Sequence, residues 1–176
     1  MSPKPIVLSL GILTLCISGI ARAATPEAGH IAFQAAAGLN APFEKENKLG
    51  FEVEAAAEYF WRQRVGFRGT VGYARSTSNF PNSPIAATGY LLGSGVYNWE
   101  LGNVHPFGLL GIGVYAVSPA VGGSTARFGV HAGAGAEYFL NRRTSVTGQG
   151  LFHFLGSVND QKSSFFGATA GFRYYF

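Results

Sequence analysis

The sequence contains almost no cysteine and few charged residues. Its one cysteine, Cys16, lies within an apolar N-terminal segment, so the rest of the chain offers no disulfide, thiolate nucleophile or cysteine-based metal site. Charged residues make up 12% of the chain, whereas about a quarter is usual in soluble domains. Such a chain would have a sparsely charged surface in water, and a protein surrounded by lipid has less need of surface charge.

Long apolar runs are absent after the N-terminal segment. No stretch between residues 24 and 176 is apolar over the roughly 20 residues that a membrane helix needs. The N-terminal segment combines Lys4, an apolar run from Ile6 to Ile20 and the small-residue ending Ala21-Arg22-Ala23, which is typical of an export signal cleaved after Ala23. We therefore expect a signal peptide at residues 1–23 and one domain at residues 24–176.

The net charge is modest. The formal charge of +4 falls to +2 when Lys4 and Arg22 leave with the signal peptide, because 11 basic residues then face 9 acidic ones. This balance gives no reason to expect a nucleic acid partner.

Apolar and polar residues alternate with period two in eight segments, as they do in half-buried strands. These segments are residues 30–39, 49–60, 64–75, 86–99, 104–117, 126–140, 144–155 and 164–176. In the second segment, the clearest case, Glu52, Glu54 and Glu58 alternate with apolar residues, so one face is polar and the other suits lipid. In the fourth and fifth segments either face can be the apolar one; in the fifth we expect Leu110 and Ile112 to face outwards.

The breaks between these segments alternate in length. The breaks after the second, fourth and sixth hold roughly three or four residues, and the others roughly eight or nine. Outer-membrane barrels show this alternation because they have short periplasmic turns and longer external loops. The sequence therefore predicts an all-β fold, an eight-stranded antiparallel up-and-down transmembrane β-barrel with an interior filled by side chains.

The same alternation turns charged side chains towards the barrel interior: Glu52, Glu54, Glu58, Arg68, Arg127, Glu137 and Arg173. Buried charges without a partner are costly, so we expect acid–base pairs. We predict that Glu52 and Glu54 meet Arg68 on the neighbouring strand. Arg173 is expected to reach an acid such as Glu137 or Glu52. Such pairs would make the interior a plug instead of an open pore.

Aromatic residues lie near the ends of several segments, where an interfacial girdle is expected: Tyr59, Trp61, Tyr97, Trp99 and Tyr138. Residues 164–176 alternate strictly, and the chain stops on this predicted strand. Its Phe172, Tyr174 and Phe176 resemble the C-terminal recognition signal of bacterial outer-membrane proteins, which serves in assembly.

Together with the export signal and the eight segments, the ending Gly171-Phe172-Arg173-Tyr174-Tyr175-Phe176 is similar to that of small outer-membrane barrels of the OmpA and OmpX type, often called outer-membrane protein beta-barrel domains. The resemblance covers the whole predicted mature chain. It implies location in the outer membrane of a Gram-negative cell envelope and contact with its lipid and lipopolysaccharide. It also implies insertion by the barrel-assembly machinery through the C-terminal strand, and it names no surface ligand.

Some barrels of this architecture are enzymes. The lipid A deacylases use a His, a Ser and an acid near the C-terminal strands, and this chain offers His153, Ser157 and Glu137. The spacing of His153 and Ser157 is wrong for two side chains placed two residues apart on one strand face, so we predict that the protein is not an enzyme. His131 and His153 face the lumen in this scheme, but the histidines lack a short metal-binding spacing, so neither a metal nor a cofactor is expected.

The predicted function is that of an integral outer-membrane barrel with a plugged polar interior and a structural or surface-interaction role. One alternative is a narrow channel or carrier for small solutes across the outer membrane, which would need a continuous lumen. A second is a soluble periplasmic ligand binder of lipocalin-like form, which would need apolar residues inside and polar residues outside.

Overall fold

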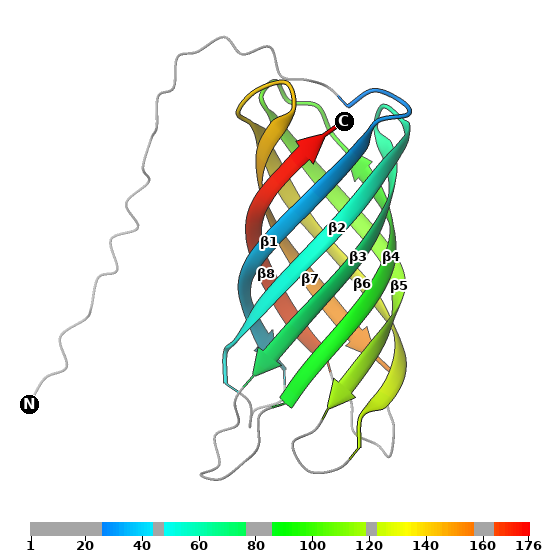
Figure 1. Cartoon of the computed structure of the whole chain (residues 1–176), viewed down its shortest axis with the longest axis vertical. Coiled ribbons are helices and arrows are strands. Elements are labelled where there is room, and N and C mark those ends of the chain that lie inside the picture. Colours follow the sequence, from blue (N-terminus) through cyan, green and yellow to red (C-terminus); the bar gives the residue numbers. More distant parts are fainter. Residues whose placement is uncertain (1–25, 44–47, 77–85, 119–122, 157–163) are drawn as a thin grey trace, which may run out of the picture.

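The computed structural model describes residues 26–43, 48–76, 86–118, 123–156 and 164–176. These residues form eight strands: β1 (Ile31–Pro42), β2 (Gly50–Arg62), β3 (Val65–Ser76), β4 (Ala86–Asn98), β5 (Val104–Ser118), β6 (Thr125–Phe139), β7 (Thr144–Leu155) and β8 (Ser164–Tyr175). Each strand pairs antiparallel with the next and β1 also pairs with β8, so the sheet closes into a barrel (Figure 1). The predicted eight-stranded up-and-down barrel is confirmed, with every strand boundary within three residues of the predicted one.

The barrel wall is built from alternating buried and exposed side chains. In β2, Glu52, Glu54 and Glu58 are buried, whereas Phe51 and Val53 are exposed. Successive side chains of a strand point to opposite faces, so the carboxylates enter the lumen and the apolar residues face outwards. Large exposed hydrophobic side chains occur on all eight strands. Such a surface suits lipid, so the soluble lipocalin-like alternative is wrong.

The alternation of apolar and polar residues did not determine which face of β4 and of β5 points into the lumen. In β4, Leu91 faces outwards, whereas Tyr90 and Ser94 are buried in the lumen. The hydroxyl groups of Tyr90 and Ser94 hydrogen-bond to side chains of other strands, and these interior partners decide the facing. In β5, Leu110 and Ile112 are exposed, as predicted.

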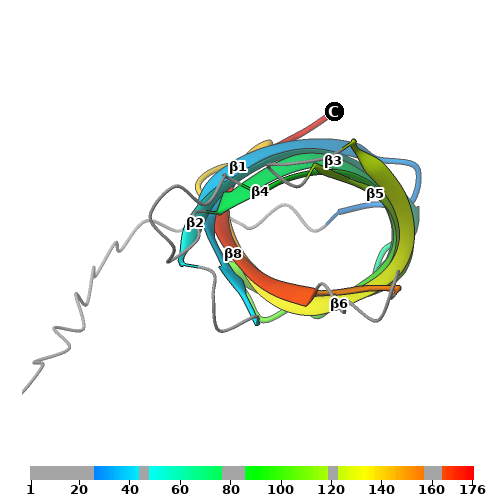
Figure 2. The ribbon, with the colours of Figure 1, turned by 90° about the horizontal axis from the view of Figure 1, so that it is seen from below.

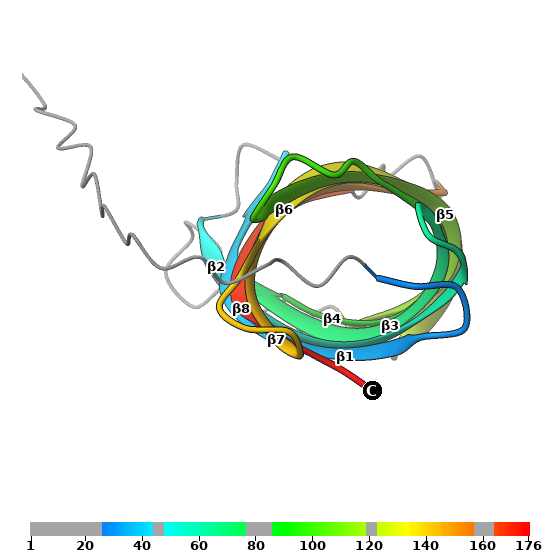
Figure 3. The same cartoon turned by 90° about the horizontal axis from the view of Figure 1, so that it is seen from above.

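The barrel has two different ends. At the turn end, short turns join β2 to β3, β4 to β5 and β6 to β7, and β8 ends there (upper end in Figure 1, seen from above in Figure 3). At the loop end, β1 ends and β2 begins (lower end in Figure 1, seen from below in Figure 2). The lumen near the turn end contains a buried cluster of Ala32, Phe60, Phe139 and Tyr175. The lumen near the loop end contains a buried cluster of Ala74, Tyr90, Leu92, Tyr115, Leu155 and Phe165.

The export signal predicted at residues 1–23 lies outside the described residues, as do most of the longer connections at the loop end. The signal peptide therefore stays a prediction. Within the part of the chain that the structure describes, no helix is long and apolar enough to cross a membrane.

Candidate functional site

The half of the lumen nearer the turn end holds a buried network of charged side chains. In this turn half, Arg173 Nη1 lies 3.0 Å from Glu137 Oε2, a pair that the sequence predicted, and 3.5 Å from Glu58 Oε2. Arg173 Nη2 donates a hydrogen bond to Gln34 Oε1 at 2.7 Å. The hydroxyl group of Tyr175 donates to Glu137 at 2.7 Å. The guanidinium of Arg173 is thus satisfied by groups from several strands.

Arg68 joins this network from β3. Its Nη2 lies 2.6 Å from Glu58 Oε2, and its Nη1 donates to Gln149 Oε1 at 3.0 Å. The ring of Phe107 lies against both guanidinium groups, with its centroid 4.8 Å from Arg68 Cζ and 5.4 Å from Arg173 Cζ. We call the following five residues, each at most 3% exposed, the plug: Glu58, Arg68, Phe107, Glu137 and Arg173.

The predicted pairing of Arg68 with Glu52 and Glu54 is wrong. Arg68 lies directly opposite Glu58 in the β2–β3 register, and the other two glutamates lie further along β2. Directly opposite side chains in antiparallel strands have Cβ atoms about 5 Å apart, so Arg68 pairs with Glu58. Alternation indicates which face a residue takes, but the register decides which residue it meets.

The half of the lumen nearer the loop end holds the other two carboxylates without an arginine in hydrogen-bond contact. In this loop half, Glu54 accepts hydrogen bonds from the hydroxyl group of Thr169 at 2.9 Å and from the side-chain amide of Gln149. Glu52 accepts a hydrogen bond from the hydroxyl group of Tyr90 at 2.6 Å. Hydroxyl and amide donors therefore reach one oxygen, Oε1, of each of these carboxylates, whereas guanidinium groups contact the carboxylates of the plug.

One histidine lies beside Glu52, and a second histidine lies next to the first. His153 Nδ1 is 3.1 Å from the Tyr115 hydroxyl, and its Nε2 is 3.9 Å from Glu52 Oε1. The ring of His131 lies 6.2 Å from that of His153, and its Nε2 is 2.7 Å from the Ser94 hydroxyl. Among the described residues, no group of three or more His, Cys, Asp or Glu side chains is placed to hold a metal ion. Both histidines contact hydroxyl groups that belong to other strands.

Inward-facing glycines make room for large interior side chains. A Cβ atom at Gly135 would lie 2.5 Å from Cζ of Phe107, and one at Gly72 would overlap the ring of Tyr90. Sequence reasoning missed Phe107 and Tyr90 because an aromatic residue fits either face of a membrane barrel. An inward glycine on the neighbouring strand is the signal that could have revealed them.

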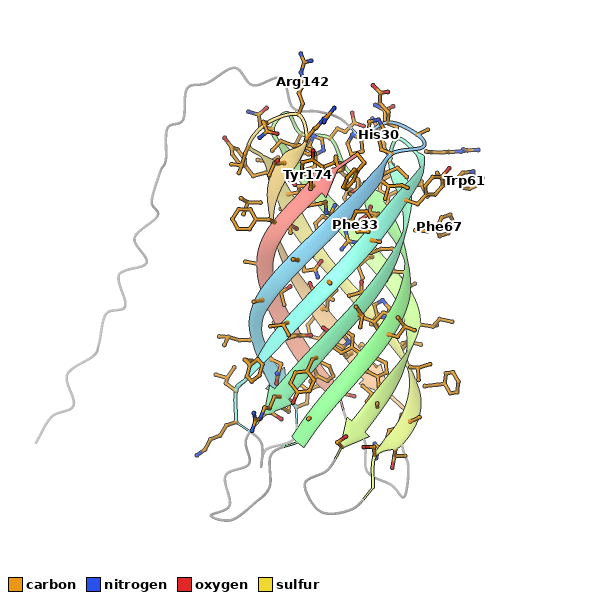
Figure 4. All side chains as sticks on the ribbon, viewed as in Figure 1. His30, Phe33, Trp61, Phe67, Arg142 and Tyr174 are labelled. Atoms are coloured by element: carbon orange, nitrogen blue, oxygen red, sulfur yellow. The ribbon has the colours of Figure 1, made fainter. Side chains whose placement is uncertain are left out.

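The other predicted residues are not part of the plug. Arg127 is half-buried near the start of β6. The predicted aromatic residues are exposed on the outer surface: Tyr59, Trp61, Tyr97, Trp99 and Tyr138, with Phe172, Tyr174 and Phe176 at the end of the chain. Figure 4 shows Trp61 and Tyr174 near the turn end. The roles of these aromatic residues at the membrane interface and in assembly stay predictions.

Of the three residues weighed as a catalytic set, the structure describes Glu137 and His153, and these two lie in different halves of the lumen. Ser157 lies outside the described residues. Glu137 belongs to the plug in the turn half, whereas His153 lies in the loop half beside Glu52.

Several solved structures share this fold at low sequence identity. Neisserial surface protein A matches with a TM-score of 0.67 and 18% identity, over 84% of this chain and 99% of its own. Ail, the attachment invasion locus protein of Yersinia pestis, matches with a TM-score of 0.54 and 17% identity, over 85% of this chain and 99% of its own. The outer membrane enzyme PagL matches with a TM-score of 0.54 and 17% identity, over 80% of this chain and 97% of its own. No curated protein matches the sequence.

The prediction that this protein is not an enzyme is contradicted by the last of these structures. PagL is an outer membrane enzyme, and it shares the barrel over 97% of its chain. The prediction relied on one missing spacing of histidine and serine, and a fold does not determine or exclude an activity. The prediction is therefore withdrawn.

The sequence model of one protein family matches the whole barrel. The family described as "Outer membrane protein beta-barrel domain" matches residues 12–176, which include all eight strands. The protein is located in the outer membrane, where its apolar outer face meets lipid. With this match and the closed barrel in agreement, the chain belongs to the outer membrane protein beta-barrel domain family.

Proposed function

We propose that this protein is an outer-membrane barrel with a plugged lumen and a structural or surface-interaction role. The observation that carries the proposal is the plug. Phe107 comes from β5, and its ring contacts Arg68 of β3 and Arg173 of β8, although none of these three strands is a neighbour of another in the sheet. Such contacts form only across the lumen, and an eight-stranded barrel leaves little room around them.

The plug is expected to stay closed because moving it would separate buried charges. Arg173 holds Glu137 and Glu58 at 3.0 and 3.5 Å, and all three side chains are almost completely buried. Removing one partner of a buried ion pair typically costs about 3–5 kcal/mol. An opening motion would therefore need a new partner for each charge.

Conductance in planar lipid bilayers tests the proposal. The refolded protein is expected to produce no steady ion current. The double variant Glu137→Ala/Arg173→Ala removes a cation and an anion together and is expected to raise the conductance. The matched control is Arg64→Ala/Glu100→Ala, a pair at 3.7 Å that is partly exposed outside the plug and is expected to leave the barrel closed. Stable current steps from the unaltered protein would contradict a plugged lumen.

Genetic complementation separates a structural role from a surface-interaction role. Neisserial surface protein A and Ail, by their names, act at the cell surface and in attachment, which supports the second role. In a deletion strain, a variant with residues 77–85 and 157–163 shortened is expected to restore detergent resistance if the barrel itself is what the envelope needs. Failure of this variant, with normal outer-membrane levels, would assign the function to a surface contact such as lipopolysaccharide.

Exposed aromatic residues on the C-terminal strand support the proposal that an assembly partner binds there. Phe172, Tyr174 and Phe176 are exposed on the outer surface, and the amide of Phe176 donates to the carbonyl of Ile31 at 2.9 Å, at the seam between β8 and β1. We infer that the barrel-assembly machinery recognises this edge. Phe176→Ala is expected to lower the outer-membrane level in cells while leaving refolding into detergent unchanged; an equal loss in both would make Phe176 a folding residue.

A narrow cation path is the second candidate. Glu52 Oε2 and Glu54 Oε2 are buried without a hydrogen-bond partner among the described residues. Carboxylates of this kind favour cations in a lumen. A cation-selective current that is lost in Glu52→Gln would support this candidate in the same bilayer recordings.

A further inference from the structure

β2 ends in an irregularity that turns two consecutive side chains outwards. Phe60 pairs with Gly66 and Arg62 pairs with Val65, so the β2–β3 register shifts at Trp61. Regular alternation would point Arg62 into the lumen, because Trp61 is exposed. Instead both Trp61 and Arg62 are exposed, while Phe60 is fully buried. Bulges commonly redirect a side chain in this way, and here the bulge brings a guanidinium to the outer surface.

Arg62 is held against the indole of Trp61. The Cζ atom of Arg62 lies 5.1 Å from the centroid of the Trp61 ring. Trp61 in turn packs against Phe67, with the ring centroids 6.3 Å apart. A guanidinium stacked on an aromatic face is attracted by its π-electrons and keeps its edge N–H donors available. The arrangement therefore presents an oriented donor group at the surface of the barrel.

The turn end around this pair is basic. Its exposed charged side chains are four arginines and one glutamate, with Glu100 partly buried: Arg62, Arg64, Arg142, Arg143, Glu27 and Glu100. Arg64 Nε lies 3.7 Å from Glu100 Oε1, and within the described residues the other three arginines form no ion pair. Figure 4 places Arg142 and Trp61 at this same end. An end with excess positive charge attracts anions.

The outward aromatic residues indicate the depth of Arg62 in the membrane. Tyrosine and tryptophan side chains lie preferentially at the level of lipid headgroups. Trp61, Tyr97 and Trp99 are all exposed at the turn end: Trp61 precedes Arg62, Tyr97 lies near the end of β4, and Trp99 lies in the turn that follows. We therefore expect Arg62 to lie at the depth of lipid phosphates.

We propose that Trp61 and Arg62 bind the headgroup of an anionic phospholipid in the leaflet at the turn end. Arg62 donates hydrogen bonds to the phosphate, and Trp61 packs against the glycerol backbone beneath it. The excess positive charge of the turn end selects phosphatidylglycerol over phosphatidylcholine, because a zwitterionic headgroup carries no net negative charge.

Tryptophan quenching by brominated lipid measures this preference directly. The chain contains two tryptophans, so Trp99→Phe leaves Trp61 as the only reporter. This variant is refolded into phosphatidylcholine vesicles that contain either brominated phosphatidylglycerol or brominated phosphatidylcholine. The quenching by brominated phosphatidylglycerol is expected to correspond to an enrichment of about fivefold around Trp61, because one arginine near an anionic surface contributes about 1 kcal/mol of attraction.

Variants assign the preference to Arg62. Arg62→Gln in the same background is expected to abolish the enrichment. The matched control is Arg75→Gln, an exposed arginine near the loop end of β3, which is expected to preserve it. Equal quenching by the two brominated lipids in the parent, or enrichment that persists in Arg62→Gln, would overturn the proposal.

Salt provides a second measurement if Arg62→Gln does not refold. In the parent, 0.5 M salt is expected to remove the enrichment of brominated phosphatidylglycerol, because the screening length between exposed charges is then well below about 10 Å. Quenching by brominated phosphatidylcholine is expected to stay unchanged. Enrichment that resists salt would mean that the headgroup charge does not determine binding, and this result would also overturn the proposal.

Discussion

The two halves of the lumen satisfy buried carboxylates by different means. In the turn half, Glu58 and Glu137 pair with Arg68 and Arg173 at 2.6–3.5 Å. In the loop half, Glu52 accepts a hydrogen bond from the Tyr90 hydroxyl at 2.6 Å and lies 3.9 Å from a histidine nitrogen. The inward-facing carboxylates of one lumen are thus held by ion pairs in the turn half and by neutral hydrogen-bond donors in the loop half.

Because of this difference, we expect the free energy of unfolding to change by different amounts when one polar side chain is removed from each half of the lumen. A buried ion pair whose partner is removed leaves an uncompensated charge, which is strongly destabilising. A carboxylate held by neutral donors can be replaced by an amide of the same shape at little cost, because the acceptor oxygen remains. We therefore expect the stability contributed by the turn half to depend on the charges of its side chains, and that contributed by the loop half to depend on their shape.

Arg173→Met is the variant expected to have the largest effect. It leaves Glu137 without its guanidinium partner in a fully buried site, so the free energy of unfolding should fall by about 3–5 kcal/mol. Urea unfolding of vesicle-refolded protein, followed by tryptophan fluorescence, measures this change. The double variant Glu137→Gln/Arg173→Met is expected to lose less than the two single changes added together. A loss of under about 1 kcal/mol in Arg173→Met would mean that the plug contributes no more than a surface pair.

Two matched substitutions compare the halves directly. Glu58→Gln removes a charge that both plug arginines contact, and it is expected to lower the unfolding free energy by about 3 kcal/mol. Glu52→Gln keeps an acceptor for the Tyr90 hydroxyl and is expected to cost about 1 kcal/mol or less. The same urea titrations provide both values. Equal losses would remove the distinction between the halves.

Gly135→Ala tests whether Phe107 needs the space that the glycine provides. The added Cβ would lie 2.5 Å from both Phe107 Cζ and the Gly148 carbonyl oxygen, so overpacking should cost about 2 kcal/mol. Gly93→Ala is the control, because it faces outwards and a Cβ there meets nothing within 4 Å; its change should stay within about 0.5 kcal/mol. The midpoint of urea unfolding checks both variants, and a neutral Gly135→Ala would show that the plug can shift.

Two tyrosine hydroxyls give the smallest expected effects. Tyr175→Phe removes a donor to the charged Glu137 and should cost about 1.5 kcal/mol, whereas Tyr115→Phe removes a hydrogen bond to His153 and should cost about 0.5–1 kcal/mol. Hydrogen bonds to charged groups are the stronger class, which sets this order. If Tyr115→Phe proved the more destabilising in urea unfolding, the loop half would be the more tightly coupled one.

Strands differ in how well their alternation predicts the lumen. β2 was assigned correctly because Glu52, Glu54 and Glu58 cannot face lipid without a partner. β4 carries no charge, so either of its faces could be turned to the lipid. Only the hydrogen bonds of Tyr90 and Ser94 with other strands reveal which face lies inside. Charge on one face of a strand is therefore the stronger signal, and its absence leaves the facing undetermined.

The amino-acid sequence by itself determined the eight strands, the closed barrel and the inward facing of the charged residues. It could do so because side chains alternate with period two in any strand, and lipid excludes unpaired charge. Only the tertiary structure decided that Arg68 meets Glu58, that Phe107 lies against two guanidinium groups, and that a bulge exposes Arg62 beside Trp61. These features depend on strand register and on contacts across the lumen, which join residues far apart in the chain and leave no periodic trace in it.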